Sequence, residues 1–168
     1  HDVLFQMMQY SDIIFGDQNE WEVASGVPHI PFEALDADYE IDKEAYQKYF
    51  RKMHQLFPKC KKMLMAVRNQ IASSHHTLSG LLYDAVEDQL YTTRIYDIEP
   101  IVDPMGVGDA FIAAYIHAHQ KWGDKNQYCL DFSLSASAIK NTVPGDQNLV
   151  TEEEIINNMT SSGGRIQR

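Results

Sequence analysis

The sequence has little of what marks a secreted, membrane-bound or zinc-binding protein. Among 168 residues it holds two cysteines, Cys60 and Cys129, which are too few and too isolated for a disulfide framework or a zinc site. No apolar run reaches the roughly 18 residues that cross a bilayer, and the opening residues do not form a signal peptide. We therefore expect a cytoplasmic protein without a membrane partner.

Basic residues are also scarce. The 14 Lys and Arg residues stand against 24 Asp and Glu residues, which gives a formal net charge of −10. A protein that binds nucleic acid needs Lys and Arg to displace counterions from phosphates, so we expect no nucleic-acid partner. A small anionic substrate is still compatible with this charge, because backbone N–H groups and Mg²⁺ can hold phosphate locally.

Strand-like and helix-like segments alternate along the chain. Short apolar runs predict strands, and apolar residues at helical spacing predict helices. The expected strands cover residues 10–16, 63–67, 80–83, 90–96 and 164–168, the expected helices cover 17–25, 42–57, 107–121, 126–140 and a short segment after 151, and a loop is expected over 73–77. This alternation predicts a single domain over residues 1–168, an α/β sandwich on a largely parallel sheet.

Residues 103–111, DPMGVGDAF, carry the chemistry that the sequence predicts. Gly106 and Gly108 stand where an extended run turns into a helix, and glycine lets a ligand approach the backbone closely. The first N–H groups of a helix lack internal partners and lie at its positive end, so this turn can bind an anion. Asp109 lies in the same turn, where a carboxylate can accept the proton of an attacking hydroxyl. The combination suits phosphoryl transfer.

The short Gly-x-Gly-Asp pattern has a second explanation. An aspartate in the first turn of a helix also complements the helix dipole, and short glycine motifs are weak signals. The segment is not a Walker motif, because no Gly-Lys-Ser or Gly-Lys-Thr follows. The pattern by itself leaves both a catalytic and a purely structural aspartate open.

The larger pattern resembles the Asp-Thr-Thr-Gly-Ala-Gly-Asp-Ala-Phe signature of ribokinase-like carbohydrate kinases. Residues 136–150, 67–80 and 164–168 also resemble segments of the 2-dehydro-3-deoxygluconate kinase subgroup. The resemblance covers essentially the whole chain but only the second half of a family member, and no initiator Met opens the chain. It implies a three-layer α/β/α sandwich with a mostly parallel sheet, without its amino-terminal part and lid.

The resemblance assigns roles to the residues of the motif. Asp109 is implied to be the catalytic base and to face the substrate. Gly106, Val107 and Gly108 are implied to line the anion hole together with the N–H group of Asp109. Gly106 and Gly108 are thereby also expected to contact the nucleotide.

Metal contacts are implied at two further places. Asp103 matches an aspartate that helps to hold a monovalent cation such as K⁺ in several members, but Pro104 and Met105 replace two threonines of the pattern and put that site in doubt. Asp17 and Glu20 resemble the family's Asn-x-x-Glu motif, which acts on Mg²⁺ and phosphate through ordered water. The same pair is also explained as a helix N-cap with a capping box.

Ligand contacts are expected from residues near two strand and helix ends. Arg68, placed just past a strand, offers a planar fork to the nucleotide phosphates or to a sugar-acid carboxylate, although a surface arginine paired with an acid would look the same. Asn69 is expected within reach of the nucleotide. Asn141 is expected either to contact the nucleotide or to cap a helix, and Lys140 is expected to be exposed to solvent.

The sequence thus predicts an ATP- and Mg²⁺-dependent kinase that phosphorylates a hydroxyl of a sugar acid, 2-dehydro-3-deoxy-D-gluconate. A ribokinase- or fructokinase-type acceptor stays open, because most acceptor contacts would lie in the absent half. A non-catalytic fragment that serves as a binding module is the third alternative. We expect the half-length chain to bind substrate poorly by itself, and its open sheet edges to favour association into a homo-oligomer.

Overall fold

The structure, a computed structural model, describes residues 2–31 and 37–161. The helices of this part are α1 Asp2–Met8, α2 Gln18–Ser25, α3 Lys43–Leu56, α4 Val107–Trp122, α5 Asn126–Lys140 and α6 Glu152–Thr160. The strands are β1 Ile13–Gly16, β2 Lys62–Ala72, β3 His75–Asp84, β4 Gln89–Thr92 and β5 Tyr96–Ile98. None of the described helices is long and apolar enough to cross a membrane. The predicted strand over 164–168 lies outside the described residues.

The strands form one mixed sheet. β1 and β2 run parallel, with Gly16 opposite Met65, whereas β3 pairs antiparallel with β2, β4 and β5. The prediction of a mostly parallel sheet therefore holds only for the β1–β2 pair. The difference arises because a tight turn at Ser73 and Ser74 joins β2 to β3, and such a turn can connect only antiparallel neighbours.

The β2–β3 hairpin is longer than its apolar residues predict. β2 continues beyond Val67 through Arg68 to Ala72, and residues 75–77, expected in a loop, form the start of β3. The register is regular from Lys62 opposite Asp84 to Gln70 opposite His76, and a shift follows before Ala72. The backbone hydrogen bonds between β2 and β3 therefore continue into polar residues, where hydrophobicity does not predict a strand.

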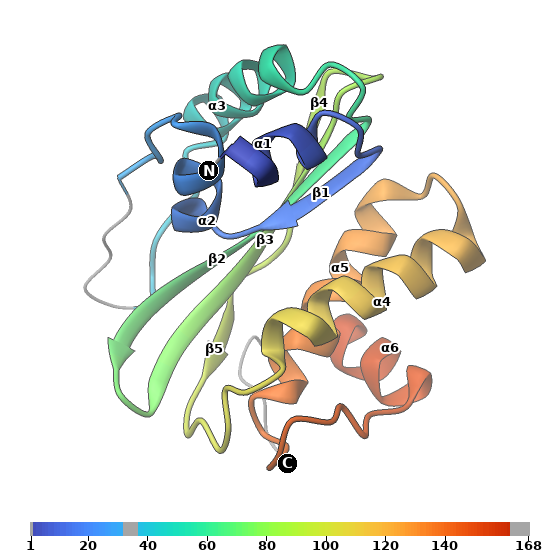
Figure 1. The fold of residues 1–168 in the computed structure, drawn as a ribbon. Helices are drawn as coiled ribbons and strands as arrows, with labels where there is room; N and C mark the ends of the chain where they lie inside the picture. The colour runs from blue at the N-terminus through green and yellow to red at the C-terminus, as the bar shows by residue number, and fades with distance from the viewer. Residues whose placement is uncertain (1, 32–36, 162–168) are drawn as a thin grey trace.

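Helices cover both faces of the sheet (Figure 1). One apolar core joins α1, α2 and α3 to Met63, Met65 and Val67 of β2, and a second core joins α4, α5 and α6 to Leu64 of β2 and Leu78 of β3. Successive residues of a strand point to opposite faces, so β2 contributes alternately to the two cores. The predicted three-layer α/β/α fold is confirmed.

The predicted helix starts are confirmed by their caps. The Asp42 carboxylate accepts the Ala45 N–H group at 2.9 Å and begins α3, whose buried face includes Tyr46, Tyr49, Phe50 and Met53. The Thr151 side chain and Glu154 form the predicted capping box of α6. Each cap satisfies an N–H group that the helix itself leaves without an acceptor.

A buried ion pair ties the sheet to α5. Lys62 Nζ donates to Asp84 Oδ2 at 2.9 Å and to Asn126 Oδ1 at 2.6 Å, and Asn126 Nδ2 donates to the same Asp84 oxygen at 2.8 Å. Lys62 is 7% exposed and Asp84 is 4% exposed. Burial alone would raise the pKa of Asp84, but hydrogen bonds from Lys62 and Asn126 outweigh it, so the pKa is lowered.

Replacing Asp84 with Asn is expected to lower the free energy of unfolding by about 3 kcal/mol, because the Lys62 ammonium loses its buried carboxylate. The lowered pKa of Asp84 in the folded state means that the unfolded chain binds this proton more readily. The contribution of Asp84 is therefore complete above about pH 4 and is lost as the pH falls further. Urea unfolding at neutral and acid pH measures both effects.

An exposed ion pair provides the control. Lys48 Nζ lies 2.6 Å from Glu44 Oε1 on the surface of α3. Glu44→Gln should change the free energy of unfolding by only about 0.3 kcal/mol, since water screens such a pair. Equal losses in Asp84→Asn and Glu44→Gln would contradict a special contribution from the buried pair.

Candidate active site

The predicted glycine turn begins α4. Gly106 is the N-cap of this helix and has a φ of 75°, in the left-handed region that favours glycine. A Cβ atom at this position would lie 2.4 Å from the backbone oxygen of Asp146 and 2.8 Å from its Oδ1. Glycine is therefore required both by the backbone conformation and by the close approach of the chain around Asp146.

The start of α4 presents free backbone donors. Within the described residues, the N–H groups of Val107, Gly108 and Asp109 have no hydrogen-bond acceptor, and the first such bond of the helix runs from Ala110 N to Gly106 O at 2.9 Å. A Cβ atom at Gly108 would meet nothing within 4 Å. These donors lie at the positive end of a helix of 16 residues, which is a favourable place for an anion.

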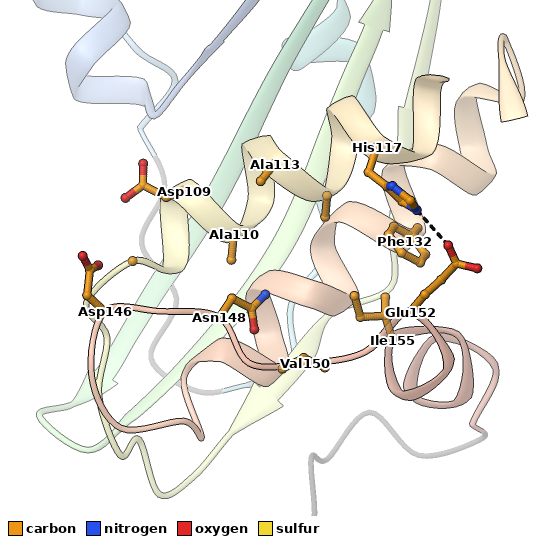
Figure 2. A pocket seen from close by; sticks show the side chains of 12 residues that line it. Asp109, Ala110, Ala113, His117, Phe132, Asp146, Asn148, Val150, Glu152 and Ile155 are labelled. Carbon is orange, nitrogen blue, oxygen red and sulfur yellow. Dashed lines mark hydrogen bonds and ion pairs between the residues drawn. The ribbon is translucent and has the colours of Figure 1, made fainter. Parts of the chain in front are cut away.

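Asp109 shares this first turn with the free donors. Its side chain is exposed to solvent, and Figure 2 shows it projecting from the start of α4, whereas Ala110 points toward Asn148 on the other side of the turn. Its carboxylate is thus available to a molecule that also reaches the donors. The structure places the predicted base and the predicted anion hole together.

A cavity of about 420 Å³ extends from this turn along α4, within the size range of small-molecule sites. Asp109 and Asp146 lie at one end of the cavity (Figure 2), and Gly106, which approaches Asp146 closely, also lines it. Its walls come from α4, α5, α6 and the segment before α6, and the apolar lining residues are Ala110, Ala113, Ala114, Phe132, Val150 and Ile155. The cavity therefore joins a polar end, lined by the carboxylates of Asp109 and Asp146 beside the first turn of α4, to an apolar slot.

A polar pair marks the far end of the slot. His117 lies 2.7 Å from Glu152 through Nε2 and Oε2, which links α4 to α6 (Figure 2). Lys121 Nζ donates to the same carboxylate at 2.6 Å, and these two partners lower the pKa of Glu152. The lining residues beyond the turn were not predicted from the sequence. The spacing of Ala110, Ala113, Ala114 and His117 on one face of α4 is the signal that could have indicated them.

Asp103 is engaged by the backbone. Its Oδ1 accepts the Met105 N–H group at 3.0 Å and its Oδ2 accepts the Gly145 N–H group at 2.9 Å. These hydrogen bonds lower the pKa of Asp103. The carboxylate thereby connects the turn before α4 to the turn after α5, and the contact of Asp103 with K⁺ stays a prediction.

Arg68 and Asn69 lie on opposite faces of the sheet. Arg68 is exposed inside β2, not past its end as predicted. It is four residues from Leu64 and therefore on the same face of the strand, the one covered by α4 to α6. Asn69 is buried on the face covered by α1 to α3. Burial, together with the charge of Arg68, lowers the pKa of His76 to about 4. The structure therefore leaves Arg68 on the side of the cavity and does not bring Asn69 there.

Asp17 and Glu20 form the capping box of α2, as their spacing predicts. Asp17 Oδ1 accepts the Glu20 N–H group at 2.9 Å, and Glu20 Oε2 accepts the Asp17 N–H group at 2.9 Å. Because β1 and β2 are parallel and Gly16 lies opposite Met65, Asp17 and Arg68 are at the same end of this strand pair. In the described part of the chain, no group of three His, Cys, Asp or Glu residues could hold a metal ion.

Asn141 has a structural position. It is fully buried at the C-cap of α5, and its Nδ2 donates to Ser137 O at 3.0 Å. Its backbone oxygen accepts the N–H groups of Val102 at 2.8 Å and Asp103 at 3.2 Å. Asn141 does not line the cavity. Its position agrees with the helix-cap alternative, and its contact with a nucleotide stays a prediction.

Solved structures of carbohydrate kinases have a fold similar to that of this chain. No protein-family model and no curated protein matches the chain. The solved structure of 2-dehydro-3-deoxygluconokinase from Thermotoga maritima matches with a TM-score of 0.80 and 26% identity, over 95% of this chain and 44% of that one. A PfkB family carbohydrate kinase from Listeria grayi matches with a TM-score of 0.75 and 24% identity, over 93% and 43% of the two chains.

A more distant match shows the same fold. Ribokinase from Arabidopsis thaliana, solved with ribose and ATP, has a TM-score of 0.61 and 19% identity, over 94% of this chain and 44% of that one. The chain spans less than half the length of these kinases, which is consistent with the predicted carboxy-terminal half of such an enzyme. The chain has the ribokinase-like α/β fold, and its structural neighbours are carbohydrate kinases of the PfkB family.

Proposed function

We propose that this chain supplies the catalytic base and the nucleotide-binding half of an ATP-dependent sugar kinase. The observation that carries the proposal is the shared first turn of α4. There, an exposed Asp109 carboxylate stands beside free N–H groups at the end of a cavity. A purely structural aspartate would require neither the cavity nor the free donors.

The proposed reaction is an in-line phosphoryl transfer. The N–H groups of Val107, Gly108 and Asp109 hold the oxygens of the γ-phosphate and stabilise the charge that grows on them. The Asp109 carboxylate accepts the proton of the acceptor hydroxyl as the hydroxyl oxygen bonds to phosphorus. The bond between phosphorus and the bridging oxygen of ADP breaks, and ADP carries away that oxygen and its negative charge.

The nucleotide would extend from the turn along α4. The apolar slot beside Ala113, Phe132 and Val150 suits the flat face of a base. Arg68, on the same face of the sheet, would approach the phosphates or the carboxylate of a sugar acid, because a guanidinium fork matches both groups. This placement leaves the outer side of Asp109 to the acceptor.

Mg²⁺ is proposed to arrive with the nucleotide. The described residues offer no resident metal site of three such ligands, and Asp17 and Glu20 each use one carboxylate oxygen in the capping box. Their position near the end of β1 still permits contact with a hydrated ion. Bound to ATP, Mg²⁺ would neutralise charge on the phosphates.

The acceptor is proposed to be 2-dehydro-3-deoxy-D-gluconate. The support is the 26% identity to the Thermotoga maritima 2-dehydro-3-deoxygluconokinase together with the resemblance of residues 136–150 to that subgroup. The matches to other sugar kinases lie below 25% identity and support the fold alone. A panel of sugars and sugar acids, assayed with the natural polypeptide, would separate this acceptor from ribose and fructose.

Asp109→Asn should lower kcat by about 10³-fold, because the acceptor proton loses its base. The Kd for MgATP should stay within about twofold, since the N–H donors are unchanged. Steady-state kinetics and calorimetric titration of the natural polypeptide measure the two quantities. Turnover near that of the wild type would contradict the assignment of Asp109. A wild-type protein that binds no MgATP would favour the binding-module alternative.

The two glycines of the turn offer a matched pair of variants. Gly106→Ala should destabilise the fold by about 2 kcal/mol and weaken MgATP binding, because its φ is positive and its Cβ would meet Asp146. Gly108→Ala has open space and helical backbone, so it should be neutral or stabilising by about 0.5 kcal/mol. Thermal unfolding and MgATP titration of both variants test the turn geometry. Similar losses in the free energy of unfolding for the two variants would contradict it.

A further inference from the structure

Lys140 carries a deeply buried positive charge. It is the last residue of α5, its exposed fraction is 0%, and its Nζ donates to the backbone oxygen of Val143 at 3.1 Å. In the described residues no carboxylate forms an ion pair with it. The prediction that Lys140 is exposed to solvent is therefore wrong. Burying an ammonium without a paired carboxylate is costly, so the surroundings must compensate this charge.

Three negative features compensate the charge. Lys140 lies at the carboxyl end of α5, which is the negative end of the helix dipole. Val143 O accepts directly from the ammonium. Asp103 is near enough for the charge of Lys140 to contribute to its lowered pKa, after the hydrogen bonds from Met105 and Gly145. The ammonium thus belongs to the junction between the turn before α4 and the turn after α5.

This junction holds the anion-binding turn in place. The Gly145 N–H group reaches Asp103 Oδ2, and the Asn141 oxygen accepts the N–H group of Asp103. Gly106 lies against Asp146, too close for a side chain. The free donors of α4 follow directly after Gly106, so their position depends on the two turns keeping this contact.

We propose that Lys140 is a positioning residue whose buried ammonium holds the turns over residues 103–106 and 143–146 together, in place of an added monovalent cation. Each oxygen of Asp103 accepts one N–H group, and the Lys140 ammonium brings to this junction the positive charge that a bound cation would otherwise supply. Its own side chain holds the ammonium there, so it does not need a full shell of oxygen ligands. This inference rests on the proposed function in one respect only, namely that the turn at the start of α4 binds an anion.

Amide hydrogen exchange tests the inference without nucleotide or turnover. The amides of Met105 and Gly145, which donate to Asp103, report on the junction. In wild-type protein their exchange should be equally slow in potassium chloride and in tetramethylammonium chloride. In Lys140→Ala it should become about tenfold faster in tetramethylammonium chloride, the change expected when one charge-assisted hydrogen bond is lost. Ammonium chloride should restore slow exchange, because the ammonium ion fits the space that the truncated side chain leaves.

The controls separate a local change from unfolding. Amides inside α3, in the core on the other face of the sheet, should keep their wild-type exchange in Lys140→Ala. The exposed Lys48 on α3 provides a matched loss of charge, and Lys48→Ala should leave Met105 and Gly145 unchanged. If Lys140→Ala unfolds, the wild-type protein still tests the proposal. Slow exchange of the Met105 and Gly145 amides that requires K⁺ would overturn it. Unchanged exchange in a folded Lys140→Ala overturns it as well.

Titration with MgATP distinguishes this inference from the proposed function. If wild-type protein binds no MgATP but Lys140→Ala loosens the junction and ammonium restores it, the kinase proposal fails and the role of Lys140 stands. If MgATP binds and Lys140→Ala leaves amide exchange at the junction unchanged, the kinase proposal stands and the inference fails. If both proposals are correct, Lys140→Ala should weaken MgATP binding about tenfold in tetramethylammonium chloride, and ammonium chloride should restore the affinity.

Discussion

The close contact between the turn before α4 and the turn after α5 is the constraint on which the site depends. Gly106 can approach Asp146 only without a side chain, and Asp103 connects both turns through backbone N–H groups. This contact directs the start of α4 into solvent with its donors free. The cavity along α4 then has a fixed polar end, and Asp109 stands beside it.

The two cores have different roles in the chain. The core under α1 to α3 is rich in aromatic residues, such as Trp21, Phe50 and Tyr83, whose rings contact one another. The core under α4 to α6 supports the helices that build the cavity. The Lys62–Asp84–Asn126 network joins the sheet to the start of α5, so it orients the helix whose other end carries Lys140. Stability and site geometry are thereby linked through one helix.

Much of this could be predicted from local sequence. The caps at Asp42 and Thr151 and the glycine turn at Gly106 act through neighbouring residues, so their signals are complete within a few positions. The pairing of β2 with β3 could not be predicted, because the polar residues after Val67 give no strand signal. The far wall of the cavity also stayed hidden, since Phe132, Val150 and Ile155 come from separate segments. The burial of Lys140 depends on a tertiary junction that no short pattern encodes.

The alternation of β2 has a consequence for how this chain tolerates insertions. Arg68 and Asn69 lie on opposite faces of the sheet, and Asn69 is buried, so a slip of one residue would exchange them and place a guanidinium at a buried position. The register shift between Gln70 and Ala72 lies beyond both residues, near the hairpin tip. Insertions and deletions can be accommodated at that tip. In the part of β2 before the tip, an insertion of one residue would move every following side chain to the opposite face of the sheet.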